Sequence, residues 1–194
     1  LRIAGKLSSY SLMERILFLQ VQQIRSEPNP QIVKLLNIAF NFERLEVGPY
    51  QVSIWDLPGR ENLRIFWPNF YRNIDFHGVI YMIDYDSKDN LDEAVRVMHD
   101  LLTEEELKNV DVLIILNYTR KDYNETNNDN QGVDYINRSE KLDPVIVSEM
   151  KKNIFFELIP QMNKELYYMD LYNDSVGNES IKQTLKSYFS KLCS

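Results

Sequence analysis

Two stretches of the chain are apolar at almost every position, residues 77–84 and residues 111–117, and each ends in a polar side chain. Continuous apolar runs are typical of strands buried on both faces of a parallel sheet, because an alternating strand has one face in water. Between the two runs, residues 90–102 repeat their apolar positions at helical spacing, and Asn90 is the expected N-cap. Strand, helix and strand over this length predict a βαβ unit.

The flanking segments predict the rest of one α/β domain. Residues 37–47 alternate between apolar and polar, and Gly48-Pro49 turns the chain into residues 50–56, which predicts a hairpin whose first strand lies towards a sheet edge. Residues 121–143 are polar and rich in asparagine and predict a long surface insertion. Further elements are expected as helices at 11–24, 145–162 (broken near Pro160) and 180–192, and as a short strand at 166–170.

Composition narrows the function classes. With 194 residues, 44% of them hydrophobic, the chain can bury the core of a single domain. A net charge of -7 argues against a nonspecific nucleic-acid binder, which needs a basic face. The single cysteine, Cys193, allows no disulfide within the chain and favours a reducing compartment, so a cytoplasmic location is expected.

The candidate chemistry begins where a strand-like run, residues 50–55, delivers Asp56 and, three positions later, Gly59. Trp-Asp-Leu-Pro-Gly-Arg at residues 55–60 resembles the Trp-Asp-x-Gly-Gly-Gln segment of Arf and Arf-like small GTPases. Residues 66–73, 78–84 and 102–111 resemble the same family in the same order, so the likeness covers about residues 37–117. The signal-recognition-particle receptor β subunit and the Rag GTPases also carry an Asp-x-Pro-Gly turn and are the alternatives.

The resemblance implies a Ras-like P-loop NTPase fold: a mostly parallel sheet with helices on both faces and one antiparallel edge hairpin. Residues 1–194 are then one Arf-like domain that carries the insertion at 121–143. In such folds, backbone N–H groups beyond the carboxyl ends of the strands hold phosphates. The implied cofactor is GTP or GDP with Mg²⁺.

Two alignments of the phosphate loop are open. In the first, Ala-Gly-Lys at residues 4–6 resembles the family's loop, so that Gly5, Lys6, Leu7 and Ser8 are the expected cofactor-binding residues. The first glycine and the preceding strand would then lie before Leu1, and leucine replaces the hydroxyl that belongs on Mg²⁺, with Ser8 as its substitute. In the second alignment, residues 15–20 are the first strand, the next loop is 21–28, and there is no phosphate loop.

The switch positions are partly retained. Asp56 is expected on the metal and the Gly59 amide on the γ-phosphate, whereas Asn37 occupies the place of the family's threonine and serves Mg²⁺ less well. Arg60 replaces the glutamine that orients the attacking water. Because arginine only donates hydrogen bonds, we expect little or no GTP hydrolysis and name no catalytic residue.

The base-reading loop departs furthest from the family. Asn117-Tyr118-Thr119-Arg120 stands where Asn-Lys-x-Asp is expected, so Asn117 is retained and the carboxylate that accepts from guanine is lost. Asp122 lies two positions too late. Loss of that acceptor should remove guanine selectivity, because buried donors on the base would stay unpaired.

Aromatic residues near the switches predict a partner surface. The set expected to bind an effector or a complex partner is Phe40, Trp55, Phe66, Trp67, Phe70 and Tyr71, and about half of the aromatic run at residues 66–71 is expected in the core. Two function classes follow: a protein-binding module or complex subunit with degenerate nucleotide motifs, or a working GTP switch in intracellular or vesicle transport. A weaker third is a nonspecific nucleotide binder. Membrane association is expected only if a native segment precedes Leu1.

Overall fold

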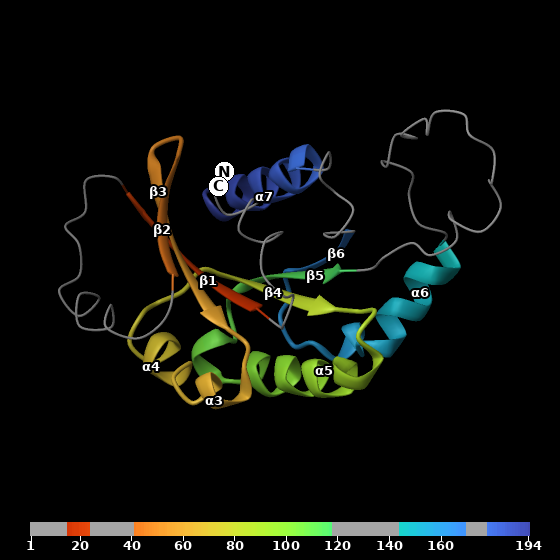
Figure 1. The fold of residues 1–194 in the computed structure, drawn as a ribbon. Coiled ribbons are helices and arrows are strands. Elements are labelled where there is room, and N and C mark those ends of the chain that lie inside the picture. Colours follow the sequence, from red (N-terminus) through yellow and green to blue (C-terminus); the bar gives the residue numbers. More distant parts are fainter. Residues whose placement is uncertain (1–14, 24–40, 118–143, 170–177) are drawn as a thin grey trace, which may run out of the picture.

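The computed structural model describes residues 15–23, 41–117, 144–169 and 178–194. They form an open sheet of six strands in the order β2-β3-β1-β4-β5-β6, with helices on both faces (Figure 1). The strands are β1 (Arg15–Gln23), β2 (Asn41–Val47), β3 (Tyr50–Pro58), β4 (Gly78–Asp84), β5 (Asp111–Asn117) and β6 (Lys164–Met169). The helices are α3 (Glu61–Arg64), α4 (Pro68–Tyr71), α5 (Lys88–Leu102), α6 (Pro144–Asn153) and α7 (Asn178–Leu192), with short 3-10 turns η1 (Glu105–Leu107) and η3 (Phe156–Leu158).

The continuous apolar runs form the centre of the sheet, as predicted. β4 pairs with β5 in parallel, and β5 with β6, while α5 connects β4 to β5. β2 and β3 form the expected hairpin, with β2 at the sheet edge and Gly48 at φ 59° in the turn. The α/β class of the predicted fold is therefore confirmed.

The direction of β1 differs from a Ras-like sheet. β1 lies between β3 and β4 but runs antiparallel to both. Four strands (β3, β4, β5 and β6) point the same way, so most of the sheet is parallel in direction. Three of its five pairings are nevertheless antiparallel, and antiparallel pairing is not confined to the edge hairpin as predicted.

The helix expected at residues 11–24 is wrong for the part that the structure describes, because residues 15–23 form β1. Ile16 and Phe18 belong to the core on one face of the sheet, and Leu17 and Leu19 to the core on the other. A strand buried on both faces is apolar at consecutive positions, and here that run also satisfies helical spacing. Burial on two faces, which the sequence pattern alone does not reveal, decides in favour of the strand.

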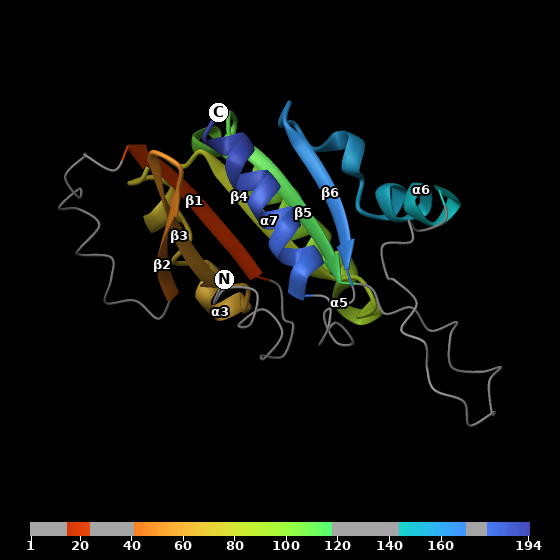
Figure 2. The same ribbon diagram turned by 90° about the horizontal axis from the view of Figure 1, so that it is seen from above.

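The two faces of the sheet carry separate cores. One core is covered by α4 and α5, and α7 covers the other, lying across β4 and β5 (Figure 2). Tyr188 on α7 connects the layers: its hydroxyl donates to the Asp111 carbonyl at 2.6 Å and lies 3.3 Å from the Val79 carbonyl. Burial raises the pKa of Tyr188 far above its ordinary value, so the hydroxyl keeps its proton.

Two helix boundaries differ from the expected ones. α5 begins at Lys88 with Ser87 as its N-cap, and Asn90 lies inside it, donating to the Ser87 hydroxyl at 3.0 Å. α6 ends at Asn153, well before Pro160, because Phe155 adopts a left-handed conformation with φ 51° and starts η3. The predicted last strand and final helix are confirmed as β6 and α7. The insertion predicted at 121–143 lies outside the described residues.

Candidate functional site

The candidate site lies at the edge where the carboxyl ends of β3, β4 and β5 meet. Asp84 and Asn117 are register partners at the ends of β4 and β5. β1 reaches the same edge with its first residue, because Arg15 pairs with both Pro58 and Met82. The chain therefore enters β1 at this edge and leaves it, after Gln23, at the opposite end beside Tyr50. A loop that follows β1 thus begins far from Asp84 and Asn117.

The turn after β3 has its carbonyls engaged. The Pro58 carbonyl accepts from Trp67 Nε1 at 3.3 Å, and the Gly59 carbonyl accepts from Arg64 Nε at 2.6 Å. Arg60 then begins α3, since its carbonyl accepts from the amides of Leu63 and Arg64, and its own side chain is exposed. The position that follows Gly59 thus presents a donor-only guanidinium towards solvent.

Asp56 is half-buried and lies between the buried residues Trp55 and Leu57 of β3. Its Oδ2 accepts from Asn41 Nδ2 of β2 at 3.2 Å, as expected for facing residues of the hairpin. Within the ranges that the structure describes, no three His, Cys, Asp or Glu side chains gather closely enough to hold a metal ion. Asp56 therefore offers one carboxylate to a Mg²⁺ ion, and a complete ligand set would need further oxygen donors.

Asn117 is buried at the end of β5 and links two strands. Its Nδ2 donates to Asp84 Oδ1 at 3.1 Å, and its carbonyl accepts from the Tyr85 amide at 2.9 Å. The side chain expected to read a base thus already bonds to a neighbouring carboxylate. This arrangement gives Asn117 a structural role at the edge, whatever else it contacts.

Replacement of Asn117 by alanine tests that structural role. The change removes a donor to a part-buried carboxylate, so the free energy of unfolding should fall by about 1–3 kcal/mol. Urea denaturation without added nucleotide measures it. Asn163→Ala is the matched control, since Asn163 donates to Asp111 Oδ1 at an exposed site and its loss should cost less. Equal stability of Asn117→Ala and the unmodified protein would contradict the structural role.

Most of the aromatic partner surface predicted from the sequence is wrong. Trp55, Trp67, Phe70 and Tyr71 are all buried in the core on the face of the sheet that α4 and α5 cover, so none of them can form a docking surface. Trp55 packs against Phe42 and Phe70, with ring centroids 4.5 Å and 5.9 Å away. Phe66 is exposed over 37% of its surface and its neighbour Ile65 over 75%. The exposed apolar pair beside the turn is therefore Ile65 and Phe66.

The sequence interpretation missed Ile65 and the contacts of Arg64. A helical repeat of Trp67, Phe70 and Tyr71 marks one face, and Ile65 and Phe66 fall away from it, which is a signal that could have separated core from surface. Arg64 bonds to Glu93, which is 29 positions away, at 2.6 Å, and a contact of that range leaves no local pattern. The Arg64 guanidinium holds the pKa of the Glu93 carboxyl below its ordinary value.

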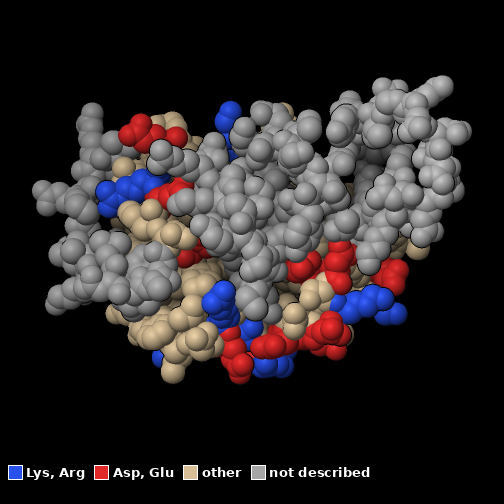
Figure 3. Space-filling view, viewed as in Figure 1, with Lys and Arg blue, Asp and Glu red and all other residues tan. Residues whose placement is uncertain are grey.

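Acidic side chains along α5 disfavour binding of a polyanion to that helix. Figure 3 shows acidic side chains gathered along the lower side of the molecule, where α5 lies, with basic ones among them. Exposed acids on α5 include Asp89, Asp92 and Asp100.

At the nearby start of η1, Glu104 bonds to Tyr71, and burial together with this carboxylate raises the pKa of Tyr71 to about 12.

Several predicted site residues lie outside the described residues: Gly5, Lys6, Leu7 and Ser8 of the phosphate loop, Asn37 and Phe40 of the first switch, and Arg120 and Asp122 of the base loop. The described edge therefore brings together Asp56, Gly59 and Asn117 only. Among the helices that the structure describes, none has the length and apolar character needed to cross a bilayer.

Known proteins that resemble this chain indicate its family. The model of the ADP-ribosylation factor family matches residues 27–154, so residues 1–8 and β1 lie outside the match. ADP-ribosylation factor-related protein 1 from Bos taurus is 31% identical over 104 residues, 52% of this chain and 51% of that protein. ADP-ribosylation factor-like protein 3 from Caenorhabditis elegans is 38% identical over 71 residues, 37% of this chain and 38% of that protein. The chain thus spans about half or less of the length of these curated relatives. The matched span, two thirds of the sequence and centred on the Asp56–Asn117 edge, means that the chain belongs to the ADP-ribosylation factor family.

Proposed function

We propose that this chain is a protein-binding module, or a subunit of a larger complex, with little or no GTPase activity. Arf-family GTPases bind GTP or GDP with Mg²⁺ and engage effector proteins. The observation that carries the proposal is Arg60, which stands after Gly59 where the family's glutamine orients water. Its guanidinium cannot accept a proton from water at any physiological pH, so the positioned nucleophile is missing.

The contacts of the other residues at this edge support the proposal that any nucleotide binds only weakly. Asn117 already bonds to Asp84, and Asp56 already accepts from Asn41, so a bound nucleotide would have to compete with both contacts. Arg120, where the sequence aligns with the family's guanine-reading aspartate, offers donors only. The hydrogen-bond donors of a bound guanine would therefore be buried without an acceptor, which makes the free energy of binding less favourable by about 1–3 kcal/mol for each group.

The proposed partner surface is centred on Ile65 and Phe66. Both are exposed apolar side chains next to the turn, on the segment between α3 and α4. Apolar side chains of this size bury well in a partner's pocket, and their exposure costs free energy in the isolated chain. The partner is a protein, and the place of action is the cytoplasm or the cytoplasmic side of a membrane.

Nucleotide content tests the proposal. Freshly purified protein is denatured and any released nucleotide is identified, and native protein is titrated calorimetrically with Mg-GTP and, separately, with Mg-ATP. We expect no stoichiometric nucleotide and an affinity for GTP no tighter than about millimolar, or roughly 4 kcal/mol of binding. Stoichiometric GDP or GTP would overturn the proposal, and equal binding of ATP and GTP would identify a nonspecific nucleotide binder.

A working GTP switch in intracellular transport is the second candidate. Asp56 and Gly59 retain their family positions, and β1 begins at the edge they face. Lys6 precedes Arg15 by nine positions, a length of chain that spans at most about 30 Å. A lysine on that segment could therefore reach a phosphate at this edge. Tight binding of Mg-GTP that is lost on Lys6→Ala would favour the switch.

A further inference from the structure

Both peptide groups that flank Gly59 are bonded through their carbonyls. The peptide between Pro58 and Gly59 carries the Gly59 N–H, and its carbonyl accepts from Trp67 Nε1. The peptide between Gly59 and Arg60 accepts from Arg64 Nε. Because each peptide group is planar, fixing a carbonyl also fixes the direction of the N–H on the same plane. The Trp67 contact therefore sets the orientation of the Gly59 N–H, and the Arg64 contact sets that of the Arg60 N–H.

Arg64 donates to the turn and to α5 from two different nitrogens. Nε donates to the Gly59 carbonyl and Nη1 donates to Glu93 Oε1, each at 2.6 Å. The Arg64 side chain is 17% exposed and the Glu93 side chain 43%. A planar fork that spans a carbonyl and a carboxylate is specific to arginine, since a lysine ammonium cannot fill both positions at once.

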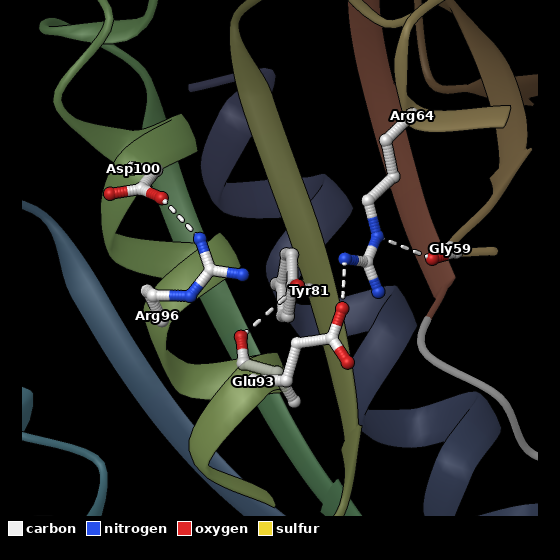
Figure 4. Close-up of polar contacts among 7 residues, drawn as sticks. Gly59, Arg64, Tyr81, Glu93, Arg96 and Asp100 are labelled. Carbon is white, nitrogen blue, oxygen red and sulfur yellow. Dashed lines mark hydrogen bonds and ion pairs between the residues drawn. The ribbon is translucent and has the colours of Figure 1, made fainter. Parts of the chain in front are cut away.

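Glu93, the carboxylate partner of Arg64, lies on a helix that is packed and hydrogen-bonded against the sheet. Glu93 lies on α5, and the next residue of that helix, Ala94, is buried. The Ala94 carbonyl accepts a hydrogen bond from the buried Tyr81 hydroxyl of β4 at 3.3 Å. Figure 4 shows Arg64 between the turn and α5, with Tyr81 joining the helix to the strand. A second ion pair on α5, Arg96 to Asp100, lies away from the turn. The Gly59 turn is thus tied through Arg64 to the central sheet.

We infer that Arg64, bridging the Gly59 carbonyl to Glu93, and Trp67, bonded to the Pro58 carbonyl, form a latch that holds the turn after β3 in one conformation. A ligand shifts a conformational equilibrium only by its differential affinity for the two states. A ligand that reorients the Gly59 N–H must therefore break the Trp67 contact, and one that reorients the Arg60 N–H must break the Arg64 contact. The latch keeps the segment that carries Ile65 and Phe66 in one arrangement until a ligand supplies the free energy to break these contacts. This inference does not depend on the proposed function.

Hydrogen exchange of the Leu63 and Arg64 amides measures the latch directly. Both amides donate to the Arg60 carbonyl, so they report opening of the turn. In Arg64→Lys and in Glu93→Gln, we expect exchange at these amides to rise by about tenfold or more, as a charged hydrogen bond is lost. Amides in the middle of α5 serve as the internal reference and should keep their rates.

Asp100→Asn is the matched control, because it removes an exposed ion pair from the same helix without touching the turn. Its Leu63 and Arg64 amides should exchange as in the unmodified protein. Glu93→Gln alters a helix surface position, so it remains informative if Arg64→Lys folds poorly. The latch is overturned if Glu93→Gln leaves the turn amides unchanged, or if exchange rises equally in α5 and in the turn.

Discussion

Replacing Trp55 by alanine is expected to lower the free energy of unfolding by about 3–5 kcal/mol, since a fully buried large aromatic side chain leaves a cavity. Trp55 lies in the middle of β3, where its ring fills the space between Phe42 and Phe70. Small domains have only about 5–15 kcal/mol in total, so this loss is a large part of the stability. Urea denaturation, followed by fluorescence from Trp67 and by circular dichroism, measures it.

Phe66→Ala is the control for Trp55→Ala. The two residues were predicted from the sequence as parts of one partner surface, but Phe66 is partly exposed, and its truncation should change stability by less than about 1 kcal/mol. Loss of partner binding in Trp55→Ala would report unfolding, whereas loss in Phe66→Ala would report the surface. A Trp55→Ala protein as stable as the unmodified one would show that the ring is not part of the core.

Whether a strand could be predicted from the sequence depended on how many of its faces are buried. β4 and β5 could be predicted because each is apolar on both faces and bounded by polar residues, which leaves one interpretation. For β1 the pattern alone left two interpretations open, because Ile16, Leu17 and their neighbours satisfy helical spacing as well as two-faced burial. The strand expected at residues 15–20 in the second alignment of the phosphate loop is the one that the structure contains. The reversed direction of β1 leaves no trace in local pattern at all, since strand periodicity is the same in both directions.

At the candidate site, the positions of the residues could be predicted from the sequence, but their contacts with residues distant in the sequence could not. Asp56, Gly59 and Asn117 could be placed at one edge because the ends of parallel strands lie together. Their actual partners could not be predicted: Asn41 for Asp56, Asp84 for Asn117, and Arg64 for the Gly59 carbonyl. Those contacts depend on register and on rotamers, which are fixed only when the core is packed. Whether an aromatic residue is buried or exposed was decided in the same way.

A second large loss of stability is expected from Gly78→Val, at the start of β4. A Cβ atom at Gly78 would lie 2.8 Å from the Tyr188 hydroxyl and 2.9 Å from Leu192 Cδ1, both on α7. The Tyr188 hydroxyl cannot move without losing its bond to the Asp111 carbonyl. We therefore expect α7 to shift and the free energy of unfolding to fall by about 2–4 kcal/mol, measured by urea denaturation.

A double-mutant cycle identifies the hydroxyl as the cause. Gly78→Ala introduces the colliding Cβ alone, and Tyr188→Phe removes the hydroxyl, at an expected cost of about 1 kcal/mol for its hydrogen bond. Combined, the two changes should cost less than their sum by about 0.5 kcal/mol or more, because the collision with the hydroxyl disappears. Additive costs would mean that Leu192, rather than Tyr188, opposes a side chain at position 78, and that the close approach of α7 to the sheet does not depend on the Tyr188 hydroxyl.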